Sequence, residues 1–408
     1  MIEPLSQAYG WLDRSLAALH RADRYRSVQT IDGMAGPTVQ RQGQTLVNFA
    51  SNDYLGLASD PRLAEAAIAA IHTYGTGSTG SRLLSGDRPL HRELEQAIAI
   101  LKGTDDAIVF SSGYLANLGA IAALVGTPDL ILGDAYNHSS LRTGGRSSGA
   151  TLVDYRHGDM AHLQDLLTTH RDRHRRCLIV TDSVFSMDGD LCPLPEILNL
   201  ADTYNAMVLV DEAHGTGVFG DRGGGAIDHL GCAGRPLVTV GTLSKALGSL
   251  GGYVAGSTAL IDFLRNRSPG WIYTTALSPA DAAAALAAVQ IVQQEPQRRQ
   301  ALWNRVDVAM QQIDRVLAEA KGVTAPGLTL QRLPTASPII CLEGPTAAAI
   351  VKASQRLQQA GLWVAAVRPP TVPTSRLRIT LMATHSQAHI DQLAAGLQRL
   401  LDPDQALA

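Results

Sequence analysis

A lysine and an aspartate each follow an apolar, strand-like run, and residues of these types could support amine chemistry on a bound cofactor. In "AMVLVDEAHGTG" the run ends at Asp211, and His214 comes three residues later. In "LVTVGTLSKALG" the run ends at Thr242, and Lys245 follows. Open α/β sheets bind ligands at the carboxyl ends of their strands, so these side chains would meet at one edge. Each also has an ordinary interpretation, Asp211 as a turn or helix cap and Lys245 as a surface lysine.

Taken together, these residue types fit pyridoxal phosphate. That cofactor needs a lysine for a Schiff base, a carboxylate that keeps the pyridine nitrogen protonated, and hydrogen-bond donors for its phosphate. Lys245 and Asp211 would supply the first two. In "FSSGYLANLG" a strand turns through Ser112 into a helix, and the first N–H groups of that helix, those of Gly113 and Tyr114, could bind the phosphate.

A glycine motif at 74–86, "YGTGSTGSRLLSG", offers a competing interpretation as a dinucleotide site. Gly75, Gly77 and Gly80 have the spacing G-x-G-x-x-G. A dinucleotide loop needs a strand before the glycines and a helix N-terminus directly after them. Here a helix-like segment precedes the motif and a further loop follows it, which disfavours a nicotinamide-dependent dehydrogenase. The glycines are better explained as a flexible loop, or as a place where backbone comes close to another ligand.

The elements that must position these residues alternate along the chain in an α/β pattern. Apolar runs such as "CLIVTDSV" and "DAIVFSS" alternate with helical segments and are typical of strands covered by helices on both sides. We predict a three-layer α/β/α large domain over residues 46–285 and a smaller C-terminal α/β domain over 286–408. Residues 1–45 are predicted to form a helical arm that packs on a domain or on a neighbouring subunit.

Composition narrows the classes of partner and compartment. The 408 residues are 45% hydrophobic, and 34 Lys and Arg balance 37 Asp and Glu, which favours neither a nucleic-acid nor a membrane partner. The N-terminus lacks a signal-peptide pattern, and the apolar runs are shorter than a membrane span. Four widely spaced cysteines suggest a reducing compartment and no structural metal. We therefore expect a cytoplasmic protein without a metal.

Six motifs resemble those of the α-oxoamine synthases, in the same order and spacing over nearly the whole chain. They are "SNDYLGL", "GSTGSRLLSG", "VFSMDGD", "DEAHGTGVFG", "TLSKALG" and "RPPTVP" before "RLRIT". The resemblance implies the pyridoxal phosphate-dependent transferase fold of type I and a homodimer. It also implies an acyltransferase that joins an amino acid to an acyl thioester with loss of carbon dioxide.

The last of these motifs is most similar to the members that condense L-alanine with pimeloyl-CoA, or with a pimeloyl-carrier protein, in biotin biosynthesis. The alternative is 2-amino-3-ketobutyrate CoA ligase, which pairs glycine with acetyl-CoA, or a member that makes 5-aminolevulinate or sphingoid bases. A non-catalytic protein of this fold would be expected to have lost Lys245 or Asp211, and both are present.

The resemblance also implies roles for residues around the cofactor ring. Lys245 would form the Schiff base and move the α-proton of the substrate. Asp211 would hold the pyridinium nitrogen, and His214 with Ser186 would reach the phenolic oxygen. His138 would stack on the ring, whereas the residues alone favour a histidine at a helix start.

Matching motifs assign the phosphate to Thr242 and to the amides of Gly113 and Tyr114. Thr275 would add a contact from the other subunit, so the resemblance implies active sites shared across a dimer interface.

For the substrate, the resemblance favours Arg378 as the partner of the amino-acid carboxylate, since a guanidinium can pair both oxygens. Strand alternation cannot separate Arg378 from Arg376, because both lie on one face. Arg368 would swing toward the same carboxylate, while Asn52 and Arg26 would line the acyl end. For Arg26 and Arg368, the residues alone equally favour an ordinary exposed arginine without a role in the site. The loop after Arg368 is two residues shorter than the usual family pattern.

Overall fold

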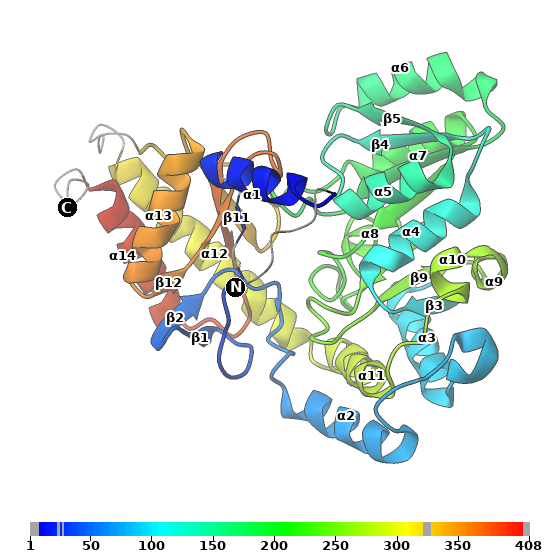
Figure 1. Ribbon diagram of the computed structural model, residues 1–408, viewed down its shortest axis with the longest axis horizontal. Coiled ribbons are helices and arrows are strands. Elements are labelled where there is room, and N and C mark those ends of the chain that lie inside the picture. The colour runs from blue at the N-terminus through cyan, green and yellow to red at the C-terminus, as the bar shows by residue number, and fades with distance from the viewer. Residues whose placement is uncertain (1–7, 23–24, 27, 321–327, 403–408) are drawn as a thin grey trace.

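A mixed β-sheet forms the centre of one lobe, on the right of Figure 1. The computed structural model describes residues 8–22, 25–26, 28–320 and 328–402. Within these residues the sheet has seven strands in the order β3-β9-β8-β7-β6-β4-β5. They are β3 (Asp106–Phe110), β4 (Leu130–Asp134), β5 (Thr151–Tyr155), β6 (Cys177–Asp182), β7 (Met207–Asp211), β8 (Val238–Thr242) and β9 (Gly252–Gly256). β9 runs antiparallel to β3 and β8, and the other neighbouring strands pair in parallel.

Helices cover both faces of this sheet, which explains why its strands are apolar on both sides. In β6, Leu178 and Val180 join the apolar cluster on one face, while Cys177 and Ile179 join the cluster on the other. The first cluster includes α4 (Gly113–Leu124), α5 (Ser139–Ser148), α9 (Thr258–Arg267) and α10 (Pro269–Ile272). The opposite side carries α6 (Met160–His170), α7 (Leu194–Thr203), α8 (Ala226–His229), α3 (Pro89–Lys102) and α11 (Pro279–Gln294), with α2 (Pro61–Tyr74) packed on α11. The predicted three-layer architecture is confirmed.

Two helices that begin at the carboxyl edge of the sheet lie directly against each other. α4 follows β3 and α5 follows β4, and their N-cap residues are Ser112 and His138. A Cβ added to Gly144 of α5 would lie 2.9 Å from Cδ1 of Ile121 in α4, closer than carbon atoms normally approach. The glycine therefore lets the two helices pack closely and brings their N-termini to one place.

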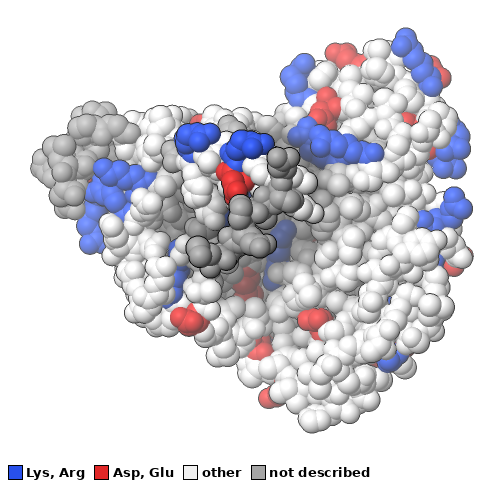
Figure 2. All heavy atoms as spheres, viewed as in Figure 1, with Lys and Arg blue, Asp and Glu red and all other residues white. Residues whose placement is uncertain are grey.

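The second lobe is built on an antiparallel sheet, which in the described residues has four strands in the order β10-β11-β14-β13. The strands are β10 (Gln331–Arg332), β11 (Ile339–Glu343), β13 (Ala365–Val367) and β14 (Arg376–Thr380). The helices α12 (Pro296–Glu319), α13 (Ala347–Gln359) and α14 (Gln387–Leu401) pack around it. Figure 2 shows the surface hollowed between the two lobes, with charged side chains in separate spots on both.

The segment before residue 50 departs from the predicted helical arm. α1 (Trp11–Arg21) is helical as predicted, but β1 (Thr38–Arg41) and β2 (Gln44–Asn48) form an antiparallel pair. β2 also pairs in parallel with β12 (Leu362–Trp363), so this segment belongs to the second lobe (Figure 1). These strands are too short for a clear alternation, and one partner lies far along the sequence. The division at residues 45 and 285 stays a prediction.

None of the helices in the described residues combines the length and the apolar character needed to cross a membrane.

Candidate active site

Acidic and polar residues end several neighbouring strands of the large sheet at its carboxyl edge. β4 ends at Asp134, β6 at Asp182, β7 at Asp211 and β8 at Thr242. Asp182 and Asp211 are directly paired in the register of β6 and β7. Parallel strands bring their carboxyl ends together, so this edge collects the residues that the sequence singled out.

Lys245 lies at the centre of this edge, on the loop after β8. Its Nζ is 2.9 Å from Nε2 of His214. Burial lowers the pKa of Lys245 to about 8, and Arg378 acts in the same direction, against the charges of Asp211 and Asp182. A lysine with this pKa is partly neutral near physiological pH, and the neutral amine is the nucleophilic form.

His214 connects Lys245 to a buried tyrosine that the sequence interpretation did not assign. The Tyr54 hydroxyl lies 2.6 Å from Nδ1 of His214. Burial lowers the pKa of His214 well below its usual value, and burial raises the pKa of Tyr54 to about 12. His214 is thus a neutral ring between a phenol and an amine. The motif "SNDYLGL" contained the signal for Tyr54, but only Asn52 was taken from it.

Asp211 is held by two donors at the end of β7. Its Oδ1 accepts from the amide of Ala213 at 2.8 Å, and its Oδ2 accepts from Nδ2 of Asn117 at 2.6 Å. In the neighbouring strand, burial raises the pKa of Asp182 well above its usual value, and the charge of Asp211 raises it further. Asp182 therefore tends toward the protonated form, and the carboxyl group of Asp211 beside it is the one that could face a pyridinium nitrogen.

The N-terminus of α4 offers amide groups near Thr242. Ser112 accepts from the amides of Leu115 and Ala116, and the amides of Gly113 and Tyr114 at the helix start have no intrahelical acceptor. A Cβ added to Gly113 would lie 3.1 Å from Cβ of Thr242, so the glycine permits this close approach.

Thr242 itself is already engaged with the protein. Its hydroxyl donates to the carbonyl of Gly251 at 2.9 Å and accepts from the amide of Ser244 at 3.1 Å. The structure therefore places Thr242 beside the predicted phosphate position. The proton of its hydroxyl group points to the carbonyl of Gly251.

The two arginines of β14 differ sharply in their partners. Arg376 forms an ion pair with Asp188 and donates to the carbonyl of Met187. Arg378 donates to three neutral acceptors: the Ser186 carbonyl at 2.6 Å, the Thr380 hydroxyl at 2.9 Å and Oδ1 of Asn52 at 3.0 Å. Both arginines are buried. Among the described residues Arg378 has no carboxylate partner within ion-pair distance, which makes it the better candidate for an anionic ligand.

These contacts also place two other predicted residues. Oδ1 of Asn52 accepts a hydrogen bond from the guanidinium of Arg378, and its predicted place at the acyl end stays a prediction. Ser186 offers its carbonyl to the same group. The structure thus brings Asn52, Ser186 and Arg378 together.

Arg26 and Arg368 line a cavity of about 750 Å³ between α1, β13 and the loop after β13. Leu16 and Leu19 of α1 and Met187, next to Ser186, also line it. The cavity combines two cations with an apolar wall. It lies beside the loop that binds Arg378 and not around Lys245.

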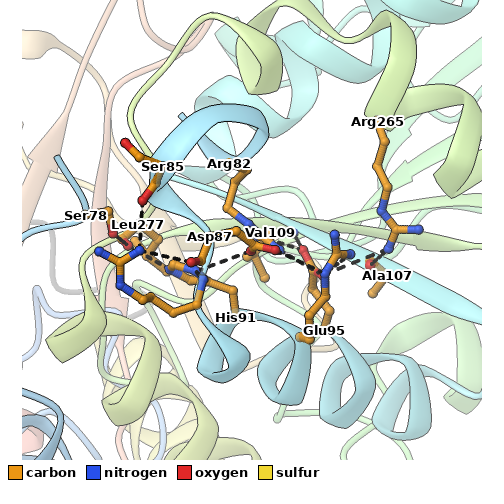
Figure 3. Close-up of polar contacts among 12 residues, drawn as sticks. Ser78, Arg82, Ser85, Asp87, His91, Glu95, Ala107, Val109, Arg265 and Leu277 are labelled. Carbon is orange, nitrogen blue, oxygen red and sulfur yellow. Dashed lines mark hydrogen bonds and ion pairs between the residues drawn. The ribbon is translucent and has the colours of Figure 1, made fainter. Parts of the chain in front are cut away.

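Thr275 is exposed, in the segment between α10 and α11. The amide of Ala276 donates to the carbonyl of Gly80 at 3.0 Å, which joins this segment to the glycine motif. Arg82 of the same motif is buried and pairs with both oxygens of Glu95 on α3 (Figure 3). The motif is therefore a rigid surface turn beside Thr275, and no strand leads into its glycines.

His138 is the N-cap residue of α5, and it is exposed. Its ring is edge-on to the ring of Tyr114, with centroids 6.5 Å apart. The described residues contain no cluster of three or more His, Cys, Asp or Glu able to hold a metal ion.

The sequence matches one family over most of its length. Residues 44–397 match the family described as aminotransferase class I and II. The chain belongs to this family. A protein of Acaryochloris marina (strain MBIC 11017), named "Putative 8-amino-7-oxononanoate synthase", is 60% identical over 393 residues, which cover 96% of this chain and 98% of that protein.

Solved structures of the same fold hold pyridoxal phosphate. Serine palmitoyltransferase from S. paucimobilis, with a bound PLP-myriocin aldimine, matches with a TM-score of 0.88 and 29% identity over 98% of both chains. The 8-amino-7-oxononanoate synthase of Francisella tularensis matches with a TM-score of 0.73 and 26% identity, over 87% of this chain and 97% of that one. These similarities confirm the predicted α-oxoamine synthase resemblance, fold type I, pyridoxal phosphate as cofactor and an acyltransferase.

The residues present fit this cofactor. Lys245 supplies an amine of lowered pKa, Asp211 a carboxylate and the start of α4 two amides. The roles of the individual residues remain predictions.

Proposed function

We propose that the protein is an 8-amino-7-oxononanoate synthase, which condenses L-alanine with a pimeloyl thioester in biotin biosynthesis. One new carbon–carbon bond joins the α-carbon of alanine to the thioester carbonyl carbon, and carbon dioxide and the free thiol leave. The names of relatives at about the 60% identity level support the substrate pair.

The observation that carries the proposal is the buried guanidinium of Arg378 near Lys245. Arg378 lowers the pKa of Lys245, and its own partners are neutral oxygen atoms. A buried cation of this kind is stabilised by an anionic ligand. The carboxylate of an amino acid whose amino group reaches the Lys245 position would supply that charge.

In the proposed reaction the cofactor supplies an electron sink for the carbanion at the substrate's α-carbon. Lys245 takes the α-proton and later returns a proton to the product, and its pKa of about 8 suits both directions. Asp211 keeps the pyridine nitrogen protonated. His214 and Ser186 would bind the phenolic oxygen of the cofactor, and His138 would stack on its ring.

The phosphate is held by the amides of Gly113 and Tyr114, with Thr242 and the partner copy's Thr275 completing the contact. For Thr242 to donate, its hydroxyl proton must turn from the carbonyl of Gly251.

The acyl thioester enters beside the loop that carries Met187. Arg26 and Arg368 line the cavity of about 750 Å³ there, and their charges suit the carboxylate of a dicarboxylic acyl chain or the phosphates of CoA. Asn52, whose Oδ1 accepts from Arg378, would line the acyl end beside that arginine.

A homodimer completes the site in this proposal. Leu83 and Leu84, which follow Arg82 in the glycine motif, are 57% and 87% exposed, and Tyr273 near Thr275 is 84% exposed. Large apolar side chains gathered on one surface are typical of a protein interface. The same surface carries Thr275, so a second copy docked there would bring this threonine to its partner's site.

The test is thiol release by the purified, cofactor-loaded protein. L-alanine with pimeloyl-CoA, L-alanine with pimeloyl-carrier protein, and glycine with acetyl-CoA are compared under the same conditions. Release with alanine and either pimeloyl thioester supports the proposal, and the better of the two identifies the carrier. Release only with glycine and acetyl-CoA would instead identify a 2-amino-3-ketobutyrate CoA ligase.

A further inference from the structure

A continuous row of hydrogen bonds joins Asp211 to the ring of His138 through two residues that the proposed reaction does not use. Nδ2 of Asn117 lies 2.6 Å from Oδ2 of Asp211 and 2.8 Å from Oγ of Ser140. Oγ of Ser140 lies 2.7 Å from Nδ1 of His138. Asn117 and Ser140 are both 1% exposed, so bulk water does not compete for these bonds.

The close packing of α4 on α5 makes this row possible. Asn117 lies on α4, and Ser140 lies in the first turn of α5, as the second residue after the cap His138. The amide of His138 also donates to Oδ2 of Asp182 at 2.7 Å, which fixes the backbone at the helix start. The ring is therefore held from both its backbone and its Nδ1 edge.

The direction of each bond follows from counting protons. The amide of Asn117 must turn its NH₂ toward Asp211, because the opposite orientation would place an oxygen 2.6 Å from a carboxylate oxygen. In this orientation both hydrogen bonds are made by Nδ2. Oδ1 of Asn117 is accordingly one of the buried side-chain atoms without a hydrogen-bond partner in the described residues. The second Nδ2 proton points to Ser140.

Since Ser140 Oγ accepts from Asn117, its own single proton is available for Nδ1 of His138. The amide of Ser140 also donates to Nδ1, at 3.3 Å. Nδ1 thus receives two donors and carries no proton. In a neutral ring the hydrogen is then on Nε2, at the opposite edge of the imidazole.

The surroundings of His138 agree with a neutral ring. Loss of solvation on its inner side lowers the pKa of His138 although the residue as a whole is exposed, and the Lys245 cation lowers it further. Asp211 opposes both effects.

We propose that Asn117 and Ser140 are positioning residues that hold His138 as the tautomer with its hydrogen on Nε2, and that they anchor this tautomer to the side chain of Asp211. His138 then presents a hydrogen-bond donor at its open edge. The value of that donor to catalysis rests on the proposed function, in which His138 covers the cofactor. A carboxylate or thioester carbonyl oxygen of the substrate is the kind of acceptor it would meet.

The first test reads the tautomer directly by ¹⁵N NMR of histidine-labelled protein, with and without cofactor. The His138 signals are assigned by their loss in His138→Gln. The wild-type protein is expected to show a protonated Nε2 and an unprotonated Nδ1. Ser140→Ala and Asn117→Leu are expected to give a mixture of both tautomers, whereas Ser139→Ala, which removes an exposed serine from the same helix turn, is expected to leave the signals unchanged.

A wild-type ring protonated on Nδ1, or a Ser140→Ala ring that keeps the wild-type tautomer, would overturn the inference. Ser140→Thr retains the hydroxyl and is expected to restore the wild-type signals. If Ser140→Ala fails to fold, Asn117→Leu and Ser140→Thr still give the comparison.

The second test separates the inference from the proposed function. In the condensation assay, Ser140→Ala is expected to lower kcat about tenfold with a small change in KM, the scale seen when an outer partner of a histidine is removed. If no substrate pair turns over but the tautomer changes as described, the proposed function fails and the inference stands. If alanine condensation proceeds but the tautomer is insensitive to Ser140 and Asn117, the inference fails alone.

Discussion

Arg376 and Arg378 show at the level of single residues what sequence could and could not predict. Their alternation on β14 placed both on one face and could not choose between them. The structure separates them by their partners, a carboxylate for Arg376 and neutral oxygens for Arg378. Asp188, Ser186 and Asn52, the partners that distinguish the two arginines, lie 188 or more residues away in the sequence, so no local pattern reveals them. Lys245 and Asp211 were identifiable because Asp211 is the last residue of β7 and Lys245 follows the end of β8 at Thr242.

Substitution of the two arginines is expected to give opposite phenotypes. Arg378→Met should raise KM for the amino acid by about 100-fold, because a charged hydrogen-bonded contact with its carboxylate is lost. It should change stability little. Arg376→Met should leave Asp188 unpaired and lower the free energy of unfolding by about 3 kcal/mol. Steady-state kinetics and urea titration of both variants provide the check, and equal effects on KM would contradict the assignment.

The lowered pKa of Lys245 predicts a pH dependence for capture of the cofactor by the cofactor-free protein. Only the neutral amine reacts, so the capture rate should rise about tenfold per pH unit below pH 8 and level off above it. The rate is followed by the growth of the visible absorption band between pH 6 and 9.5. A normal lysine would keep rising toward pH 10, and that profile would contradict the lowered value. Lys245→Ala gives the background.

At the scale of elements, the strands of the large sheet were predictable and the small strands were not. Buried strands such as β6 begin with a continuous apolar run, here "CLIV", and this signal can be recognised without knowing which strand is the partner. β1, β2 and β12 hold two to five residues each, and their pairing joins opposite ends of the sequence. The antiparallel direction of β9 was also invisible, because "GYVAG" gives no sign of strand direction.

The packing at the start of α4 predicts that alanine substitutions at two glycines, Gly252 and Gly113, lower the stability by different amounts. A Cβ on Gly252 of β9 would lie 2.4 Å from the backbone nitrogen of Gly113, whereas the nearest atom to a Cβ on Gly113 would be Cβ of Thr242, at 3.1 Å. Gly252→Ala should therefore push α4 away and cost about 3 kcal/mol of stability, while Gly113→Ala should cost about 1 kcal/mol. Thermal unfolding measures both. A Gly252→Ala protein as stable as Gly113→Ala would show that α4 moves freely.

Equilibrium titration with pyridoxal phosphate measures how strongly the Gly252→Ala and Gly113→Ala variants bind the cofactor. Both variants should bind the cofactor more weakly than the wild type, because both disturb the two amides at the helix start. Gly126→Ala, at a glycine whose added Cβ would meet its nearest atom at 3.4 Å, serves as the control.

For the whole molecule, the glycine motif provides a test of the proposed dimer. Leu84→Asp places a charge in the exposed apolar patch and should convert the dimer to monomers, since a buried unpaired charge is costly. Ile100→Asp changes another exposed apolar side chain, at the far end of α3, and should leave the dimer intact. Light scattering gives the masses. A monomeric wild type, or a dimeric Leu84→Asp, would contradict the proposed interface.

The buried pair of Arg82 and Glu95 explains why that patch keeps its shape. Glu95 accepts from Arg82, from Arg92 and from the amide of Val109, so the turn is bound at once to α3 and β3 (Figure 3). The sequence showed the glycines of this turn but not its ion pair, because the two partners are 13 residues apart with a loop between them.

The pairing of β2 with β12 also sets an order of events during synthesis on the ribosome. Asn48 must wait for Trp363, its partner in the register, while the strands β3 to β9 between them are made in full. At ordinary elongation rates this delay is roughly 15–60 s, and domains generally fold as they emerge. The large sheet can therefore form first, while the earliest strands of the chain remain without their neighbour until almost the last.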